Sequence, residues 1–194
     1  LGLAAMGFAR PGCRLTSGSI LFDGMELRTM PEVDKQKIWG TRIAYVAQSA
    51  AAAFNPAHKL IDQTIEASLR KGMFSVKDAQ ADAIELYRAM QLPDPEKIGF
   101  RYPHQVSGGQ LQRAMTAMAM ASRPDLIIFD EPTTALDVTT QVEVLAAMRN
   151  AVERFNTAAI YITHDLAVVA QMADRIKVLR YGVEMEEAET NKML

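Results

Sequence analysis

The chain has 194 residues, of which 49% are hydrophobic and 23% are charged, and its formal net charge is -2. This size and apolar content predict one globular domain with room for a small inserted subdomain, and they argue against disorder. A balance so close to neutral gives no electrostatic reason to expect nucleic acid as a partner.

The chain opens with the apolar stretch LGLAAMGFAR. It lacks the basic segment and the small-residue cleavage site of a signal peptide, and because residue 1 is Leu we expect a fragment whose beginning is missing. No run reaches the roughly 20 apolar residues that span a bilayer, so any membrane association would go through a partner. Cys13 is the only cysteine, which excludes an internal disulfide and favours a reducing compartment.

The first half of the chain changes its pattern twice. Residues 18–27, GSILFDGMEL, alternate around Asp23 and Gly24 and predict a β-hairpin. Residues 42–47, RIAYVA, predict a strand. From about 60 to 91 apolar residues recur at helical spacing and predict an all-helical block, which LPDPEKIG ends because two close prolines break a helix.

Two unbroken apolar runs follow in the second half, DLIIFDEP at 125–132 and AAIYITHD at 158–165. Such runs are typical of strands buried on both faces of a parallel sheet. Residues 138–155 between them predict an amphipathic helix with Asp137 at its N-cap. The order strand, helix, strand implies a right-handed crossover and an α/β core.

Polar residues follow the predicted core strands: Gln48 after the first, Asp130 and Glu131 after the second, and His164 after the third. Ligands of open parallel sheets bind at the carboxyl ends of the strands, so we expect these groups to converge. Each could instead be an ordinary turn residue at a strand end.

The pair Asp130 and Glu131 has a specific chemical use. One carboxylate can hold Mg²⁺, which prefers oxygen ligands, and the next can orient or deprotonate a water molecule. The alternative is a solvated acidic loop with Pro132 as a turn former.

Residues 104–113, HQVSGGQLQR, place Ser107, Gly108 and Gly109 where a helix would start. A helix N-terminus offers free N–H groups to an anion such as phosphate, and glycine lets the ligand come close. Ser107 as a plain N-cap is the alternative.

Together these segments resemble the nucleotide-binding subunit of ATP-binding cassette (ABC) transporters across residues 20–187. VSGGQ is similar to the family signature, LIIFDEP to Walker B, TALD to the D-loop, Gln48 to the Q-loop glutamine and His164 to the switch histidine. Phrases such as FNPAHKLIDQTIEASL and DEPTTALDVTTQ resemble the branch that imports dipeptides, oligopeptides and nickel into bacteria.

The resemblance implies a P-loop NTPase-type parallel-sheet core with an N-terminal antiparallel β-hairpin and an inserted helical subdomain. It divides the chain into a catalytic core of residues 1–57 and 106–194 and a helical subdomain of residues 58–105. The whole would be a single ABC ATPase domain, truncated at both ends.

The resemblance also implies ATP and Mg²⁺ as cofactors. Glu131 and His164 would be catalytic, and Gln48 and Asp130 would address the metal. The remaining nucleotide contacts would come from Ser107, Gly108, Gly109, Gln110 and Asp137.

The partners it implies are a second ABC ATPase subunit, identical or paralogous, transmembrane permease subunits and, indirectly, a periplasmic substrate-binding protein. No nucleic acid is expected. The protein would lie peripherally on the cytoplasmic face of the inner membrane.

The chain departs from the family most clearly where it has no G-x-x-x-x-G-K-[ST] segment, the Walker A loop that cradles phosphates. The residues given therefore cannot make a complete ATP site, and we expect them to be inactive alone. Val106 replaces the usual Leu of the signature, and Leu111 stands where this branch generally has Arg.

Two alternatives stay open. A non-transport ABC ATPase acting on DNA or ribosomes would need long coiled-coil insertions or tandem cassettes, and the interval between Gln48 and Ser107 is short and has no heptads. A degenerate cassette acting as an interaction subunit would explain the missing loop but not the presence of Glu131 and His164.

Overall fold

The computed structural model describes residues 1–72, 74–134 and 136–193. Met73 of the predicted helical block, Ala135 of the TALD segment and Leu194 lie outside the described residues. Within the described residues, no helix is long and apolar enough to cross a membrane.

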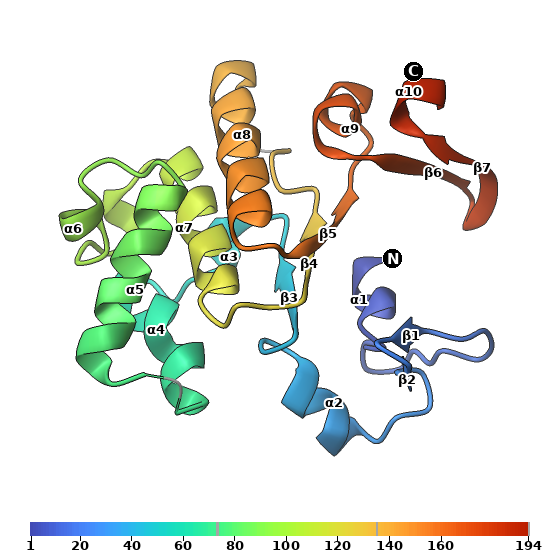
Figure 1. Ribbon diagram of the computed structural model, residues 1–194, viewed down its shortest axis with the longest axis horizontal. Coiled ribbons are helices and arrows are strands. Elements are labelled where there is room, and N and C mark those ends of the chain that lie inside the picture. The colour runs from blue at the N-terminus through green and yellow to red at the C-terminus, as the bar shows by residue number, and fades with distance from the viewer. Residues whose placement is uncertain (73, 135, 194) are drawn as a thin grey trace.

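A parallel sheet forms the centre of the molecule (Figure 1). Its strands are β3 (Ile43–Val46), β4 (Leu126–Asp130) and β5 (Ala158–Ile162), in the order β3-β4-β5. Val46 pairs with Phe129 and Asp130 with Ile162, so the three carboxyl ends lie side by side. The predicted α/β core with a parallel sheet is confirmed.

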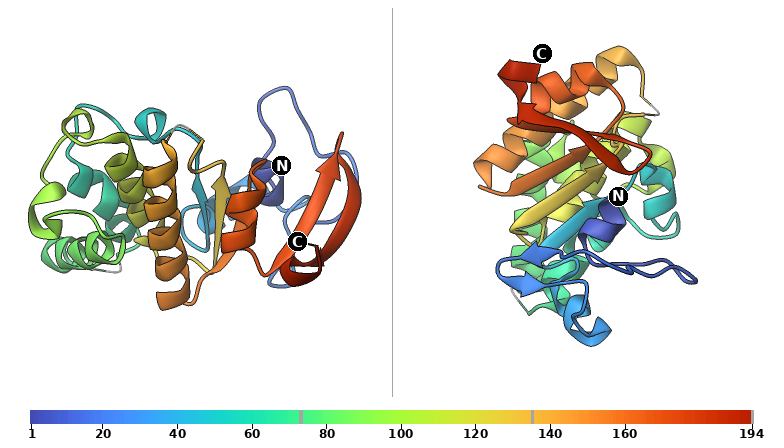
Figure 2. Two further views of the ribbon diagram at one scale, coloured as in Figure 1. Left: turned by 90° about the horizontal axis from the view of Figure 1, so that it is seen from above. Right: turned by 90° about the vertical axis from the view of Figure 1, so that its right-hand side faces the viewer.

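Both faces of β3 and β4 are covered, which explains why these strands read as apolar runs. β5 is covered less completely than its apolar run predicts, since Ala158 and Ile160 are exposed. Ile127 and Phe129 of β4 face a large cluster with α7 (Gly108–Met120) and α8 (Val138–Arg154). Ile128, between them, faces a smaller cluster near α1 (Gly2–Ala5) and α2 (Glu32–Ile38). Figure 2 shows these layers from the side.

The predicted helical block is α4 (Leu60–Arg70) and α5 (Val76–Ala89), with the short α6 (Pro95–Ile98) and a 3-10 turn at Pro103–Gln105. The helical block ends before LPDPEKIG, as predicted, since α5 ends at Ala89. The same segment also contains α6, because Pro95 stands at the first helical position, where no intrahelical hydrogen bond from its nitrogen is needed. The Thr64 and Tyr87 hydroxyls, 2.7 Å apart, join α4 to α5. Both helices share one hydrophobic cluster with α7, so the division at residues 58 and 105 stays a prediction.

The predicted hairpin is β1 (Leu21–Phe22) with β2 (Met25–Glu26). Asp23 and Gly24 have φ of 49° and 76°, as a two-residue hairpin turn requires. A second hairpin, β6 (Arg175–Arg180) with β7 (Val183–Glu189), precedes α10 (Thr190–Met193). The other short helices are α3 (Ala50–Ala53) and α9 (Leu166–Met172).

Candidate functional site

Side chains from three loops meet at the carboxyl ends of β3, β4 and β5. Gln48 Nε2 donates a hydrogen bond to Glu131 Oε2 over 3.2 Å. His164 Nδ1 lies 3.2 Å from the other carboxylate oxygen, Oε1. The structure therefore brings together residues that are 83 and 33 positions apart in the chain, with Glu131 at the centre.

The backbone at Glu131 is bent to aim this side chain. Its φ is 49°, in the left-handed region that non-glycine residues seldom occupy. Its N–H donates to the Ile162 carbonyl over 2.8 Å, which ties the bend to the end of β5. Conformations of this kind cost free energy and cluster at functional sites.

A third hydrogen bond to Glu131 was not anticipated from the sequence. Thr134 Oγ1 donates to Glu131 Oε2 over 3.0 Å, from a turn that also joins Thr134 to the Glu131 carbonyl. The only signal was a hydroxyl three residues beyond the acid. Hydrogen bonds from His164 first and then Thr134 hold the pKa of Glu131 below its ordinary value, so this carboxyl is ionised at neutral pH.

Asp130 lies at the end of β4 and bonds to a residue that the sequence did not single out. Tyr45 Oη donates to Asp130 Oδ2 over 2.5 Å, from β3 to β4. Burial first, and then the hydrogen bond and charge of Asp130, raise the pKa of Tyr45 to about 12. The phenol therefore keeps its proton and acts as a donor.

The predicted anion site at the start of α7 has the expected helix geometry. Ser107 Oγ accepts from the Gln110 N–H over 3.3 Å, and Gln110 Oε1 accepts from the Ser107 N–H over 3.1 Å. This reciprocal pair is a capping box. Both side chains are thus used locally, and any anion would be held by the remaining N–H groups of the first turn.

Asp137 caps α8, as predicted, by accepting from the Thr140 N–H over 3.0 Å. The first turns of α7 and α8 are in close contact. A Cβ added to Gly109 would come within 2.4 Å of Thr140 Cγ2. Among the described residues, no hydrogen bond joins Ser107, Gln110 or Asp137 to the Glu131 cluster. The predicted site residues therefore form two groups on one protomer.

The donors present suit a hard cation that keeps most of its own water. The Gln48 amide turns its nitrogen to Glu131, which leaves its oxygen for another ligand. Asp130 Oδ1 accepts no hydrogen bond from the described residues, and those residues contain no group of three or more His, Cys, Asp or Glu side chains able to hold a metal. One carboxylate and one amide oxygen fit Mg²⁺, which takes one or two protein carboxylates, waters and substrate phosphates.

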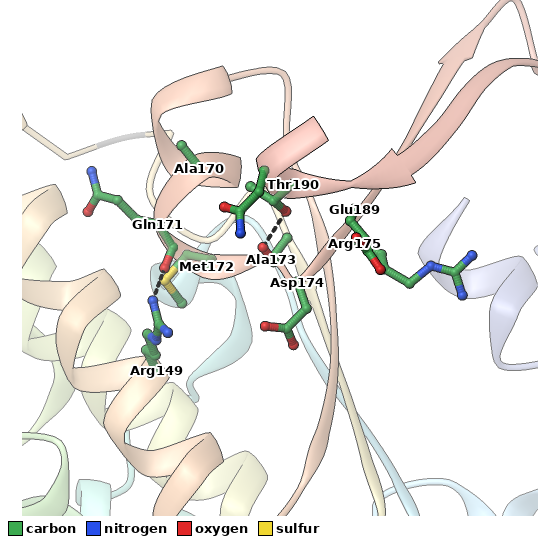
Figure 3. A pocket seen from close by; sticks show the side chains of 10 residues that line it. Arg149, Ala170, Gln171, Met172, Ala173, Asp174, Arg175, Glu189 and Thr190 are labelled. Atoms are coloured by element: carbon green, nitrogen blue, oxygen red, sulfur yellow. Dashed lines mark hydrogen bonds between the residues drawn. The ribbon is translucent and has the colours of Figure 1, made fainter. Parts of the chain in front are cut away.

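A separate pocket of about 460 Å³ lies between α9 and the β6–β7 hairpin (Figure 3). Arg149 Nη1 donates to the Gln171 carbonyl on one side of it, and Thr190 Oγ1 donates to the Ala173 carbonyl on the other. None of its lining residues belongs to the predicted site. The candidate site is therefore not this pocket but the open ends of the three strands.

Comparisons with known proteins agree on one family. Residues 4–134 match the family model described as ABC transporter. The chain is 40% identical over 169 residues to the oligopeptide transport ATP-binding protein OppD of Bacillus subtilis, covering 87% of this chain and 47% of that protein. It is 38% identical over 178 residues to the metal-staphylopine import system ATP-binding protein CntD of Staphylococcus aureus, covering 92% of this chain and 66% of that protein.

Solved structures agree on the fold. A dimeric structure of the ATP-binding cassette MJ0796, bound to ADP and Pi in a post-hydrolysis state, superimposes with a TM-score of 0.80 at 24% identity. The match covers 97% of this chain and 78% of that chain. The chain spans about half the length of the curated relatives it matches.

Proposed function

Because this chain belongs to the ABC transporter family, we propose that it is the ATP-binding and ATP-hydrolysing subunit of an importer, with peptides as the solute class. The observation that carries the proposal is the ionised Glu131 carboxylate, held between Gln48, Thr134 and His164 at the ends of adjacent strands. The name of the oligopeptide relative supports the solute class.

In this proposal Glu131 orients the attacking water and accepts its proton, since an ionised carboxylate is a competent base. His164, whose Nδ1 lies 3.2 Å from Glu131 Oε1, would contact the γ-phosphate. Asp130 and Gln48 hold Mg²⁺, which when bound offsets the charge of the phosphates. Catalysis then rests mainly on positioning and charge stabilisation.

The second group of residues acts across a dimer. We propose that Ser107, Gly108, Gly109 and Gln110 of one protomer face the nucleotide of its partner, and that Asp137 links the two sites. The separation of these residues from the Glu131 cluster within one protomer supports a shared site. The partner would be an identical or paralogous ABC ATPase subunit. The pair would lie on the cytoplasmic face of the inner membrane against permease subunits. A periplasmic substrate-binding protein would deliver the solute to those permease subunits.

A second candidate is a degenerate cassette that serves as an interaction subunit without hydrolysing ATP. It would apply if the complete reading frame has no G-x-x-x-x-G-K-[ST] segment; these 194 residues, about half the length of the relatives, contain none. The backbone N–H groups and Lys of that loop hold the phosphates in related enzymes. The two candidates therefore differ in one measurable property, ATP turnover.

The test measures ATP turnover by the product of the complete native reading frame, reconstituted with its permease in liposomes and given peptide. Turnover should fall about 10²- to 10⁴-fold in Glu131→Gln, the range for loss of a general base. Glu186→Gln is the matched control, because Glu186 is exposed on β7 and makes no ion pair among the described residues. No ATP turnover in the wild type would replace this proposal with the degenerate cassette. Turnover in Glu131→Gln equal to that of an active wild type would instead refute Glu131 as the base.

A further inference from the structure

Tyr45 is placed to control one oxygen of Asp130. It pairs with Ile128 in the register of β3 and β4, and Asp130 lies two residues beyond Ile128 on the same face of the sheet. From there the Tyr45 hydroxyl reaches Asp130 Oδ2 at 2.5 Å. The bond thus joins two neighbouring strands at the point where the sheet meets the candidate site.

The Tyr45 ring is itself held by α1. A Cβ added to Gly2 would come within 3.1 Å of Tyr45 Cε2, 3.0 Å of Ile162 Cδ1 and 3.3 Å of Ile128 Cγ2. Gly2 is buried, so the backbone of α1 lies directly on side chains from all three strands. A ring packed in this way has little freedom, and its hydroxyl keeps a fixed position.

We propose that Tyr45 is a positioning residue for the metal: its hydroxyl holds Asp130 Oδ2 and thereby turns Oδ1 toward Mg²⁺. This inference rests on the proposed function, because Asp130 has a metal to address only if the chain binds Mg²⁺ with a nucleotide. Hydrogen-bond partners of metal ligands fix ligand orientation, and their loss typically weakens metal affinity 10- to 100-fold. Tyr45 would act in that way through Asp130, without touching the metal.

The chain offers a matched control on β5, the strand on the other side of β4. Tyr161 of β5 stacks on Phe129 with ring centroids 4.8 Å apart, on the opposite face of the sheet. Its hydroxyl makes no hydrogen bond among the described residues. Tyr45→Phe and Tyr161→Phe therefore remove the same atom from the two strands that flank β4, but only the first breaks a hydrogen bond to Asp130.

The experiment uses the product of the complete native reading frame and follows Mn²⁺ binding by electron paramagnetic resonance in the presence of ADP. Tyr45→Phe should weaken Mn²⁺ affinity about tenfold or more, with ADP affinity in excess chelator unchanged. Tyr161→Phe should match the wild type in both. Tyr45→Met, which also lacks the hydroxyl but fills the space under α1, should show the same loss as Tyr45→Phe.

The outcomes separate the two proposals. Equal Mn²⁺ affinity in Tyr45→Phe and Tyr161→Phe, or tighter binding in Tyr45→Phe, overturns the positioning role alone. A loss in Tyr45→Met but not in Tyr45→Phe assigns the effect to ring packing and also overturns it. A wild type that binds neither Mn²⁺ nor ADP overturns the proposed function together with this inference.

Discussion

The contact between α7 and α8 makes a sharp prediction for two adjacent glycines. A Cβ at Gly109 would lie 2.4 Å from Thr140 Cγ2, whereas a Cβ at Gly108 would lie 3.7 Å from Leu136 Cδ2. Carbon atoms in ordinary contact are about 3.5–4.0 Å apart, so Gly109→Ala must open the helix pair by about 1 Å or force Thr140 into another rotamer. Gly108→Ala meets only ordinary contact.

Overpacking of this size costs about 1–3 kcal/mol. At about 2–4 °C per kcal/mol for a chain of this length, the melting temperature of Gly109→Ala should fall by roughly 2–12 °C. Gly108→Ala should be neutral or slightly stabilising, because alanine favours helix by up to about 1 kcal/mol over glycine. Thermal unfolding followed by circular dichroism measures both.

The responsible atom can be removed separately. Thr140→Ser deletes Cγ2 and keeps the backbone N–H that donates a hydrogen bond to Asp137 Oδ1. In a double-mutant cycle, Thr140→Ser should therefore recover most of the stability lost in Gly109→Ala. Equal melting temperatures for Gly108→Ala and Gly109→Ala, or no recovery in the double variant, would refute the steric reasoning.

Two further predictions concern the loop after β4. Thr134→Val removes the hydroxyl that donates to Glu131 and should lower ATP turnover roughly two- to tenfold at unchanged KM. Thr134→Ser keeps the hydroxyl and should retain turnover. If both variants show the same steady-state turnover, the hydroxyl is not the cause. Hydrogen bonds from Thr140 lower the pKa of Asp137 from 3.8, so its stabilising effect is present above about pH 4 and is lost as the pH falls. Asp137→Asn keeps an N-cap residue whose side chain does not titrate. Between pH 6 and pH 3 the melting temperature of Asp137→Asn should therefore fall less steeply than that of the wild type. Identical pH profiles would contradict a stabilising role for the ionised Asp137 carboxylate.

The strands and caps of the core could be read from the sequence because their signals are local. The run before Asp130 is apolar at every position, as expected of a strand covered on both faces, and β4 is covered in this way. The run before His164 also predicts a strand, although Ile160 of β5 is 39% exposed. Ser107 and Asp137 precede helical patterns at the spacing of N-caps. These features depend on a few neighbouring residues, and the structure has them where they were expected.

The contacts that complete the site depend on the assembled sheet instead. Nothing in RIAYVA shows that the Tyr45 hydroxyl will reach an acid 85 residues later, because that requires the register of β3 against β4. Thr134 likewise bonds to Glu131 only because the backbone bends at the acid. Short helices such as α3 and α6 also escape prediction, since four residues do not form a stable helix without tertiary packing.

The parallel pairing of β3 with β4 has a consequence for synthesis of the chain. Ile43 pairs with Leu126, so β3 emerges from the ribosome 83 residues before its partner. At a synthesis rate of about 5–20 residues per second, β3 has no partner strand on either edge for roughly 4–17 s, until β4 has been made. Segments exposed in this way are prone to aggregate, so we expect early collapse of α4 and α5, or a chaperone that covers β3, to protect the nascent chain during that interval.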